Sequence, residues 1–258
     1  MAPGPGTVHV LKKIRGKFWA PRAPRAEPFP DEWAAFLWQH SAHYRRLPGR
    51  LQAAFEQDVQ RFIAAHRITG VEVDVDDRLR LLVAASAATL SVGWRGYTWS
   101  EVSEVLLYPA DFDRDYAIGR SELAGQAHVW GTVILSVPSL LHSFTYDEDP
   151  YHVGVHEFAH LLTYARGLPT AIPVGVAAAR IPLWEQIQSQ ELQRIAAGDS
   201  VIDVYALGPS EFFTCAVEAF FQTPIVMRGN HRRLYGFLSR YFRQIPATWE
   251  SRLRAQRV

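Results

Sequence analysis

Two histidines and a glutamate near the middle of the sequence have the types and the spacing that zinc chemistry requires. His156, Glu157 and His160 form the pattern H-E-x-x-H. Residues four apart lie one turn apart on the same face of a helix, so the two imidazoles can converge on one Zn²⁺. Glu157 points about 100° away around the helix axis. It can therefore act as a base toward a water on the ion without binding the ion itself.

The flanking residues favour a metal over an ordinary pair of core histidines. Val153, Phe158 and Leu161 belong to a stretch that is apolar nearly all round, so its helix should be buried. Buried imidazoles need polar partners, which a metal provides. The alternative is that both rings bond to backbone carbonyl groups. A chance match to the pattern is rare at this composition, and we expect one Zn²⁺ per chain.

A catalytic zinc site needs a third protein ligand and one open position. Glu211 and Glu218 are seven positions apart in an otherwise apolar run, so they share one face of a predicted helix. One carboxylate could bind the zinc while the other accepts a hydrogen bond from a ligand histidine. The spacing alone does not separate these roles. The alternative is that both carboxylates face solvent.

Four other residues have side chains that can bind metals. His152 precedes His156 by four positions, but a fourth protein ligand would close the site. Cys215 follows the first of the two glutamates by one turn, and we expect a small buried side chain there. His40 and His43 are expected on a surface helix, with no acid or cysteine at ligand spacing.

The elements that must position these residues are mostly helical, which predicts an α+β fold with a small sheet beside the H-E-x-x-H helix. Helices are expected from Asp31, from Pro48, and over residues 79–92, 149–167, 183–197, 211–221 and 234–241. Strands are expected over residues 71–75, 104–108 and 129–136. Residues 167–182 hold two glycines and three prolines, and should form a loop that could rim the site.

Composition limits the remaining possibilities. Residues 1–30 contain six prolines and all three lysines, which predicts an extended basic arm before a single domain over residues 31–258. A net charge of +1 gives no bulk attraction to nucleic acid. The chain has no apolar run long enough to span a membrane and no apolar segment typical of a secretory signal. With one cysteine, no intrachain disulfide can form, and we expect a cytoplasmic protein.

Several stretches of the chain resemble one known family. The most specific are HEFAH and the glutamate of SEFF, Glu211, which follows His160 by 51 positions. Supporting stretches are EVLLYPADF, LAGQAHVWGTVILS and DVYALGPSEFF. Together they resemble the Mlc titration factor A family over roughly residues 31–246. Its members are bacterial glucose-regulated zinc peptidases related to the catalytic domain of anthrax lethal factor.

The resemblance implies a zincin-like (gluzincin) metallopeptidase fold. It implies His156, His160 and Glu211 as zinc ligands and Glu157 as the catalytic base. It also implies Tyr205 near the zinc, although the family's tyrosine usually stands one residue farther from the glutamate. Family members often carry Asp where this chain has Thr163. The loop over residues 167–182 also looks unlike its relatives.

For function, the resemblance implies aminopeptidase-like hydrolysis of a peptide substrate. The family's namesake captures a transcriptional repressor, so a repressor protein is a further implied partner. The alternative function is a non-catalytic, repressor-binding regulator whose zinc site is vestigial or structural. The presence of Glu157 favours the enzyme, because a structural zinc does not need a base.

Overall fold

The computed structural model of the chain describes residues 28–120, 122–146, 149–165, 168–208 and 210–255. The predicted arm over residues 1–30 lies almost wholly outside these ranges. The helices are α1 (Asp31–His40), α2 (Ala42–Arg46), α3 (Gly49–Ala65), α4 (Asp77–Ser91), α5 (Val137–Thr145), α6 (Val153–Leu161), α7 (Ile181–Ala196), α8 (Phe212–Gln222), α9 (Pro224–Asn230), α10 (Arg232–Phe242) and α11 (Pro246–Ala255), with short 3₁₀ turns η1 (Ala178–Arg180) and η2 (Val204–Leu207). None of the described helices is long and apolar enough to cross a membrane.

A small mixed sheet has the strand order β1-β2-β4-β3. Its strands are β1 (Ile68–Gly70), β2 (Glu104–Tyr108), β4 (Thr132–Ser136) and β3 (Gly125–Ala127). The first three are parallel to one another, and β3 pairs antiparallel with β4 at the edge of the sheet. A second, two-stranded ribbon joins β5 (Tyr164–Ala165) to β6 (Leu168–Pro169). The prediction of a mostly helical chain with a small sheet is confirmed.

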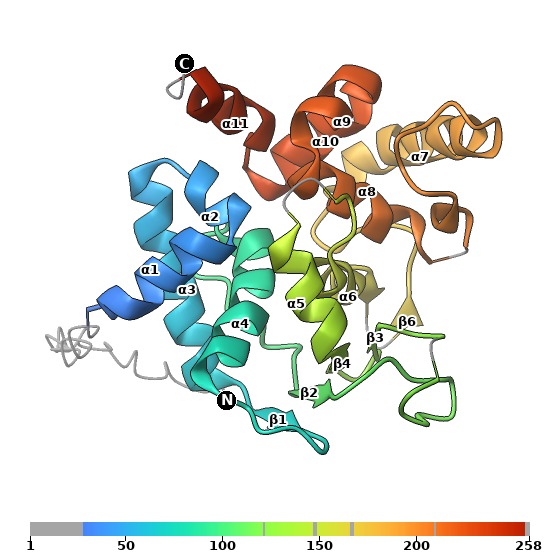
Figure 1. Cartoon of the computed structure of the whole chain (residues 1–258). Coiled ribbons are helices and arrows are strands. Elements are labelled where there is room, and N and C mark those ends of the chain that lie inside the picture. The colour runs from blue at the N-terminus through green and yellow to red at the C-terminus, as the bar shows by residue number, and fades with distance from the viewer. Residues whose placement is uncertain (1–27, 121, 147–148, 166–167, 209, 256–258) are drawn as a thin grey trace, which may run out of the picture.

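Helix α6 carries the H-E-x-x-H motif and lies at the centre of the molecule. All nine of its residues are buried, and it contacts β3, β4, α4 and α8. Gly154 allows the close approach to α4, because a β-carbon there would lie 2.2 Å from Oγ of Ser86. In Figure 1 the helices α1 to α4 lie on one side of α5 and α6, and α8 to α10 lie on the other.

Helix α8 is held against α6 by its apolar side chains. All eleven of its residues are buried, and the rings of Phe213, Phe220 and Phe221 pack around Phe242 of α10. Because α6 and α8 are both enclosed, their polar side chains must find partners between the two helices.

Some predicted elements were wrong or missed. No strand covers residues 71–75, because the chain turns back there: Glu72 has a φ of 57°, and a β-carbon on Gly70 would lie 1.9 Å from the carbonyl oxygen of Val73. The predicted helix over residues 211–221 ends at Gln222, and a new helix, α9, begins at Pro224. The short elements β3, α5, α9 and α11 were not predicted.

Candidate metal centre

The two motif histidines point their Nε2 atoms at one carboxylate oxygen. His156 Nε2 lies 3.1 Å from Oε2 of Glu211, and His160 Nε2 lies 3.3 Å from the same oxygen. One donor atom from each of these three residues lies within 4.8 Å of the other two. The structure thus brings together the two histidines of α6 and the glutamate that precedes α8.

Glu211 is positioned by the turn before α8. It occupies the N-cap position of that helix, and Ser210 Oγ donates a hydrogen bond of 2.9 Å to its Oε1. This leaves Oε2 to face the histidines. Gly208 makes room for the side chain, because a β-carbon there would lie 2.8 Å from Cγ of Glu211.

Glu218 orients His156 from the opposite side of the ring. The Nδ1 atom of His156 lies 2.8 Å from Oε2 of Glu218, and the other oxygen accepts a 2.8 Å bond from the backbone N–H of His152. Since a carboxylate can only accept, Nδ1 donates to Glu218, and Nε2, which faces Glu211 and His160, is the nitrogen that a metal ion would take in place of a proton. The two glutamates that the spacing could not separate therefore lie on different sides of one imidazole.

A second group of possible donors shares His156 and adds Cys215 and Glu218. We favour the first group for two reasons. It contains both imidazoles, and it uses Nε2 of His156, the ring nitrogen that does not bond to Glu218. The pKa of the Cys215 thiol is raised by burial and by the charges of Glu218 and Glu211, so the metal-binding thiolate is disfavoured.

The residues present fit a metal ion. Two imidazole nitrogens and a carboxylate oxygen are the donors that zinc accepts in catalytic sites. Burial by itself lowers the pKa of His156, yet Glu218 and Glu211 raise it well above its usual value. Burial raises the pKa of Glu211, but hydrogen bonds from His156 and His160 hold it well below its usual range. The pocket between these side chains therefore favours positive charge, which an ion would supply.

Glu157 stands apart from these donors and faces a cavity. Its carboxyl group is buried, and burial raises its pKa against the opposing effect of the nearby histidines. Gly125 of β3 lies directly against it, since a β-carbon there would be 2.7 Å from Cγ of Glu157. The direction of this pKa shift is the one expected of a general base.

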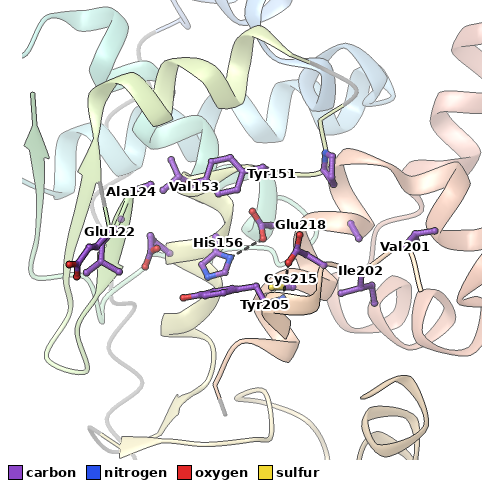
Figure 2. A pocket seen from close by; sticks show the side chains of 16 residues that line it. Glu122, Ala124, Tyr151, Val153, His156, Val201, Ile202, Tyr205, Cys215 and Glu218 are labelled. Atoms are coloured by element: carbon purple, nitrogen blue, oxygen red, sulfur yellow. Dashed lines mark hydrogen bonds and ion pairs between the residues drawn. The ribbon is translucent and has the colours of Figure 1, made fainter. Parts of the chain in front are cut away.

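The cavity beside His156 and Glu157 has a volume of about 340 Å³. Its lining is largely apolar and comes from residues 122–125, 150, 151, 153, 201–203 and 205, and from the face of α8 that carries Cys215 and Ala219. In Figure 2, Tyr205 lies alongside His156 with Glu218 on the other side of the ring. The Tyr205 and His156 rings are 6.1 Å apart between centroids, and Tyr205 is 57 % exposed.

Comparison with known proteins identifies the family. The family model for glucose-regulated metallopeptidases, M90, matches residues 16–243. The chain belongs to this family. An uncharacterized protein of Synechocystis sp. (strain ATCC 27184 / PCC 6803 / Kazusa) is also similar, with 25 % identity over 241 residues, 87 % of this chain and 88 % of that protein. The resemblance predicted from the sequence motifs is thereby confirmed, and the M90 family implies a metal at a site where His156, His160 and Glu211 could hold one.

Two other predictions for this M90 chain can be compared with the structure. His152 caps the start of α6, where its Nδ1 accepts a 3.2 Å bond from the N–H of Val155, and its ring belongs to neither group of possible metal donors among the described residues. The loop prediction for residues 167–182 is partly wrong, because β6, η1 and the start of α7 fall there. No described residue of that segment lines the cavity beside the site.

Sequence reasoning missed two residues that shape this M90 site. Tyr164 stacks on the ring of His160 at 6.2 Å and donates a 3.0 Å hydrogen bond to the carbonyl of Ala127 in β3. Gly125 gives Glu157 its space. The stretch LAGQAHVWGTVILS contains Gly125 and carried the family resemblance, but its spacing gave no sign that the glycine faces the base.

Proposed function

We propose that this protein is a zinc-dependent peptidase with a zincin-like (gluzincin) fold. His156, His160 and Glu211 would bind one Zn²⁺, and Glu157 would be the catalytic base. The observation that carries the proposal is that the three glutamates Glu157, Glu211 and Glu218 lie in three different environments. Glu211 faces both histidines, Glu218 holds one of them in place, and Glu157 is left uncommitted at the cavity.

A bound zinc ion would polarise the scissile carbonyl group and lower the pKa of water. The protein's own side chains would do the rest. Glu157 takes the proton of the attacking water and delivers it to the leaving amine, and its raised pKa suits both transfers. Tyr205, beside His156, would donate its phenol O–H to the oxygen on which negative charge develops.

We propose a peptide as substrate and aminopeptidase-like cleavage, on the basis of the family resemblance. The cavity lining adds support, because Glu122 and Asp203 place two carboxylates there that could pair with a cationic N-terminus. We also propose a cytoplasmic location, which rests on the single cysteine.

The alternative is a non-catalytic regulator that binds a transcriptional repressor and uses its zinc only to hold the fold. A structural zinc site is closed by four protein ligands. Here the favoured group has three, and a carboxyl group that is not part of it lies buried at the cavity. That arrangement favours the enzyme.

Replacement of the base tests the proposal. In Glu157→Gln the side chain keeps its size but cannot take a proton, so we expect unchanged zinc content and hydrolysis lowered by about 10²-fold or more. The matched control is Glu185→Gln on the exposed side of α7, which should leave both unchanged. Peptide hydrolysis is measured with and without a chelator. Undiminished hydrolysis by Glu157→Gln would rule out this role for Glu157.

A further inference from the structure

One wall of the cavity is a segment without long regular structure. The connection between α7 and α8 lines the cavity with Val201, Ile202, Asp203 and Tyr205. Among the described residues of this connection, the short turn η2 is the only regular element. The other walls belong to α6, to α8 and to the chain that leads into β3. A wall of this kind must be held by side-chain contacts if the cavity is to keep its shape.

A buried imidazole, that of His231, holds this segment from behind. His231 is 1 % exposed and stands at the junction of α9 and α10. Its Nε2 accepts a 3.3 Å hydrogen bond from the backbone N–H of Val201, so its proton must be on Nδ1. Nδ1 lies 2.6 Å from Oε2 of Glu191 in α7. Glu191 therefore fixes the tautomer that lets His231 hold Val201.

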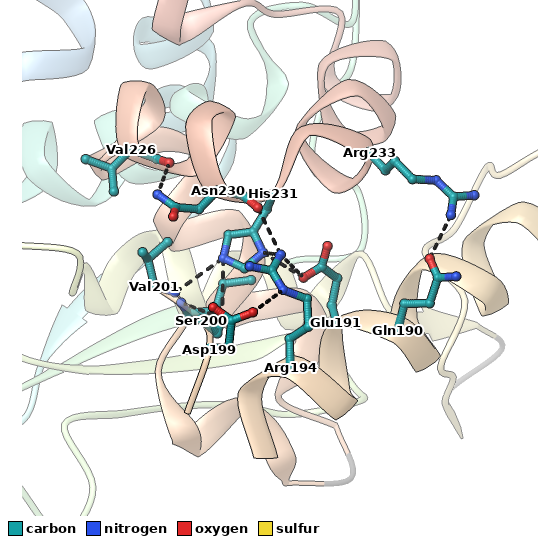
Figure 3. A network of polar contacts seen from close by, with 11 residues as sticks. Gln190, Glu191, Arg194, Asp199, Ser200, Val201, Val226, Asn230, His231 and Arg233 are labelled. Atoms are coloured by element: carbon teal, nitrogen blue, oxygen red, sulfur yellow. Dashed lines mark hydrogen bonds and ion pairs between the residues drawn. The ribbon is translucent and has the colours of Figure 1, made fainter. Parts of the chain in front are cut away.

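Further contacts brace the same segment, as Figure 3 shows. Arg194 bonds to Asp199 at 3.3 Å and pairs with Glu191 at 3.3 Å. Ser200 Oγ accepts a 3.0 Å bond from the N–H of Ile202 and lies 3.4 Å from Nε2 of His231. These contacts connect the start of the cavity wall at Val201, and Asp199 just before it, to α7 and to the junction of α9 and α10.

Ser200, His231 and Glu191 are also the residue types of a serine hydrolase triad. The contacts argue against that reading. The N–H of Val201 already occupies the Nε2 lone pair that would take the serine proton, and Ser200 Oγ accepts a hydrogen bond from the backbone. Through His231, Glu191 of α7 is instead connected to the backbone of Val201.

We propose that Glu191 and His231 are a positioning pair that fixes the wall at residues 201–205 and thereby gives the site a preference for peptides with a large apolar residue beside the scissile bond. The proposal rests on the proposed peptidase function. The cavity opens onto His156 and Glu157, its volume of about 340 Å³ suits one large side chain, and its lining is mainly apolar. Glu122 and Asp203 line it too, so acidic substrate residues are disfavoured.

Two substitutions at Glu191 test whether the Glu191–His231 pair holds the backbone at Val201. Glu191→Gln keeps a carbonyl oxygen that can accept from Nδ1 of His231, whereas Glu191→Leu removes it. We expect amide hydrogen exchange at Val201 and Ile202 to rise about tenfold or more in the leucine variant. The glutamine variant should stay within about twofold of the parent protein. If Glu191→Leu does not fold, Ser200→Ala is the milder variant, with faster exchange at Ile202. Unchanged hydrogen exchange at Val201 and Ile202 in the variants that fold would contradict the positioning role of the pair.

Selectivity is measured with two matched peptides that carry Leu or Ala beside the scissile bond. We expect the Leu/Ala ratio of kcat/KM to fall at least about fivefold in Glu191→Leu, with the zinc content unchanged. Ala124→Leu, which fills the cavity from its opposite wall, should lower the same ratio without altering exchange at Val201. An unchanged ratio in both variants would overturn the proposed preference.

Measurements of peptide binding distinguish failure of this proposal from failure of the peptidase proposal. In the Glu157→Gln background, the affinity for the two peptides is measured with and without Glu191→Leu. If the parent protein hydrolyses neither peptide, the proposed function fails, yet a Leu preference in binding that is lost with Glu191→Leu would still support the positioning pair. Equal affinities in both backgrounds would contradict it.

Discussion

A β-carbon added to Gly125 would lie 2.7 Å from Cγ of Glu157 and 2.9 Å from its Oε1. The edge strand β3 thus touches the side chain that we propose as the base, and the carboxyl group occupies space that any other residue at position 125 would take. Glu157 can take this position because residue 125, in the neighbouring strand β3, is a glycine and has no side chain.

We therefore predict that Gly125→Ala lowers hydrolysis by roughly 10–10²-fold, because a displaced base loses its alignment with the reacting water. The three proposed metal ligands do not contact Gly125 in this way, so the zinc content should be unchanged. Gly49→Ala is the control, since a β-carbon there meets no atom within 4 Å. Parental activity in Gly125→Ala would show that Glu157 tolerates the shift or is not the base.

His160→Ala should remove most of the bound zinc, because two protein ligands rarely hold the ion against competition. Elemental analysis of purified protein measures the loss. His142→Ala is the matched control, as its half-exposed imidazole bonds to Asp149 away from the site. Near-stoichiometric zinc in His160→Ala would contradict the proposed ligand set.

The site was partly predictable because its main signals are local. His156, Glu157 and His160 lie within five residues, and Glu211 and Glu218 lie two helical turns apart, so periodicity alone suggested a shared face. The assignment of the two glutamates needed the structure, which shows them on opposite sides of the His156 ring. The pair Glu191 and His231 had no local signal, since 40 positions separate the two residues.

Tyr205→Phe removes one hydrogen-bond donor and keeps the ring. If the phenol stabilises the developing charge, kcat should drop by roughly 10–10³-fold while KM changes little. The zinc content should remain that of the parent protein. The control is Tyr146→Phe, another half-exposed tyrosine outside the cavity lining. A lower melting temperature with kcat intact would instead show that Tyr205 only packs beneath α8.

The prediction that His43 lies on the surface was wrong. The short helix α2 is covered by α3, α8 and α11, and the ring of His43 packs against Phe55, Phe221 and Trp249. Neither ring nitrogen has a hydrogen-bond partner among the described residues. Burial and the charge of Arg46 lower the pKa of His43 to about 3. The sequence pattern could not show this because α11, which contributes Trp249, was not predicted.

The lowered pKa of His43 makes stability depend on pH. Between about pH 3 and 6.5 the unfolded chain binds a proton that the folded chain does not, so stability is full above pH 6.5 and declines as the pH falls. At pH 5 the loss from this one residue is about 2 kcal/mol. Urea unfolding at pH 7 and pH 5 measures it. His43→Gln cannot titrate, so its loss between the two pH values should be smaller by that amount, and an equal loss would refute the assignment.

The proposed ligands come from both ends of the segment 161–210, since the histidines precede it in α6 and Glu211 follows it. An ion bound there would fasten the segment into a closed loop. We expect release to begin with movement of the chain around Glu211 away from α6, because this residue precedes α8 whereas both histidines lie in the buried helix α6. The rate of zinc release into excess chelator should then stop rising with chelator concentration. Metal loss would report how often this part of the chain moves, and not only the strength of three bonds.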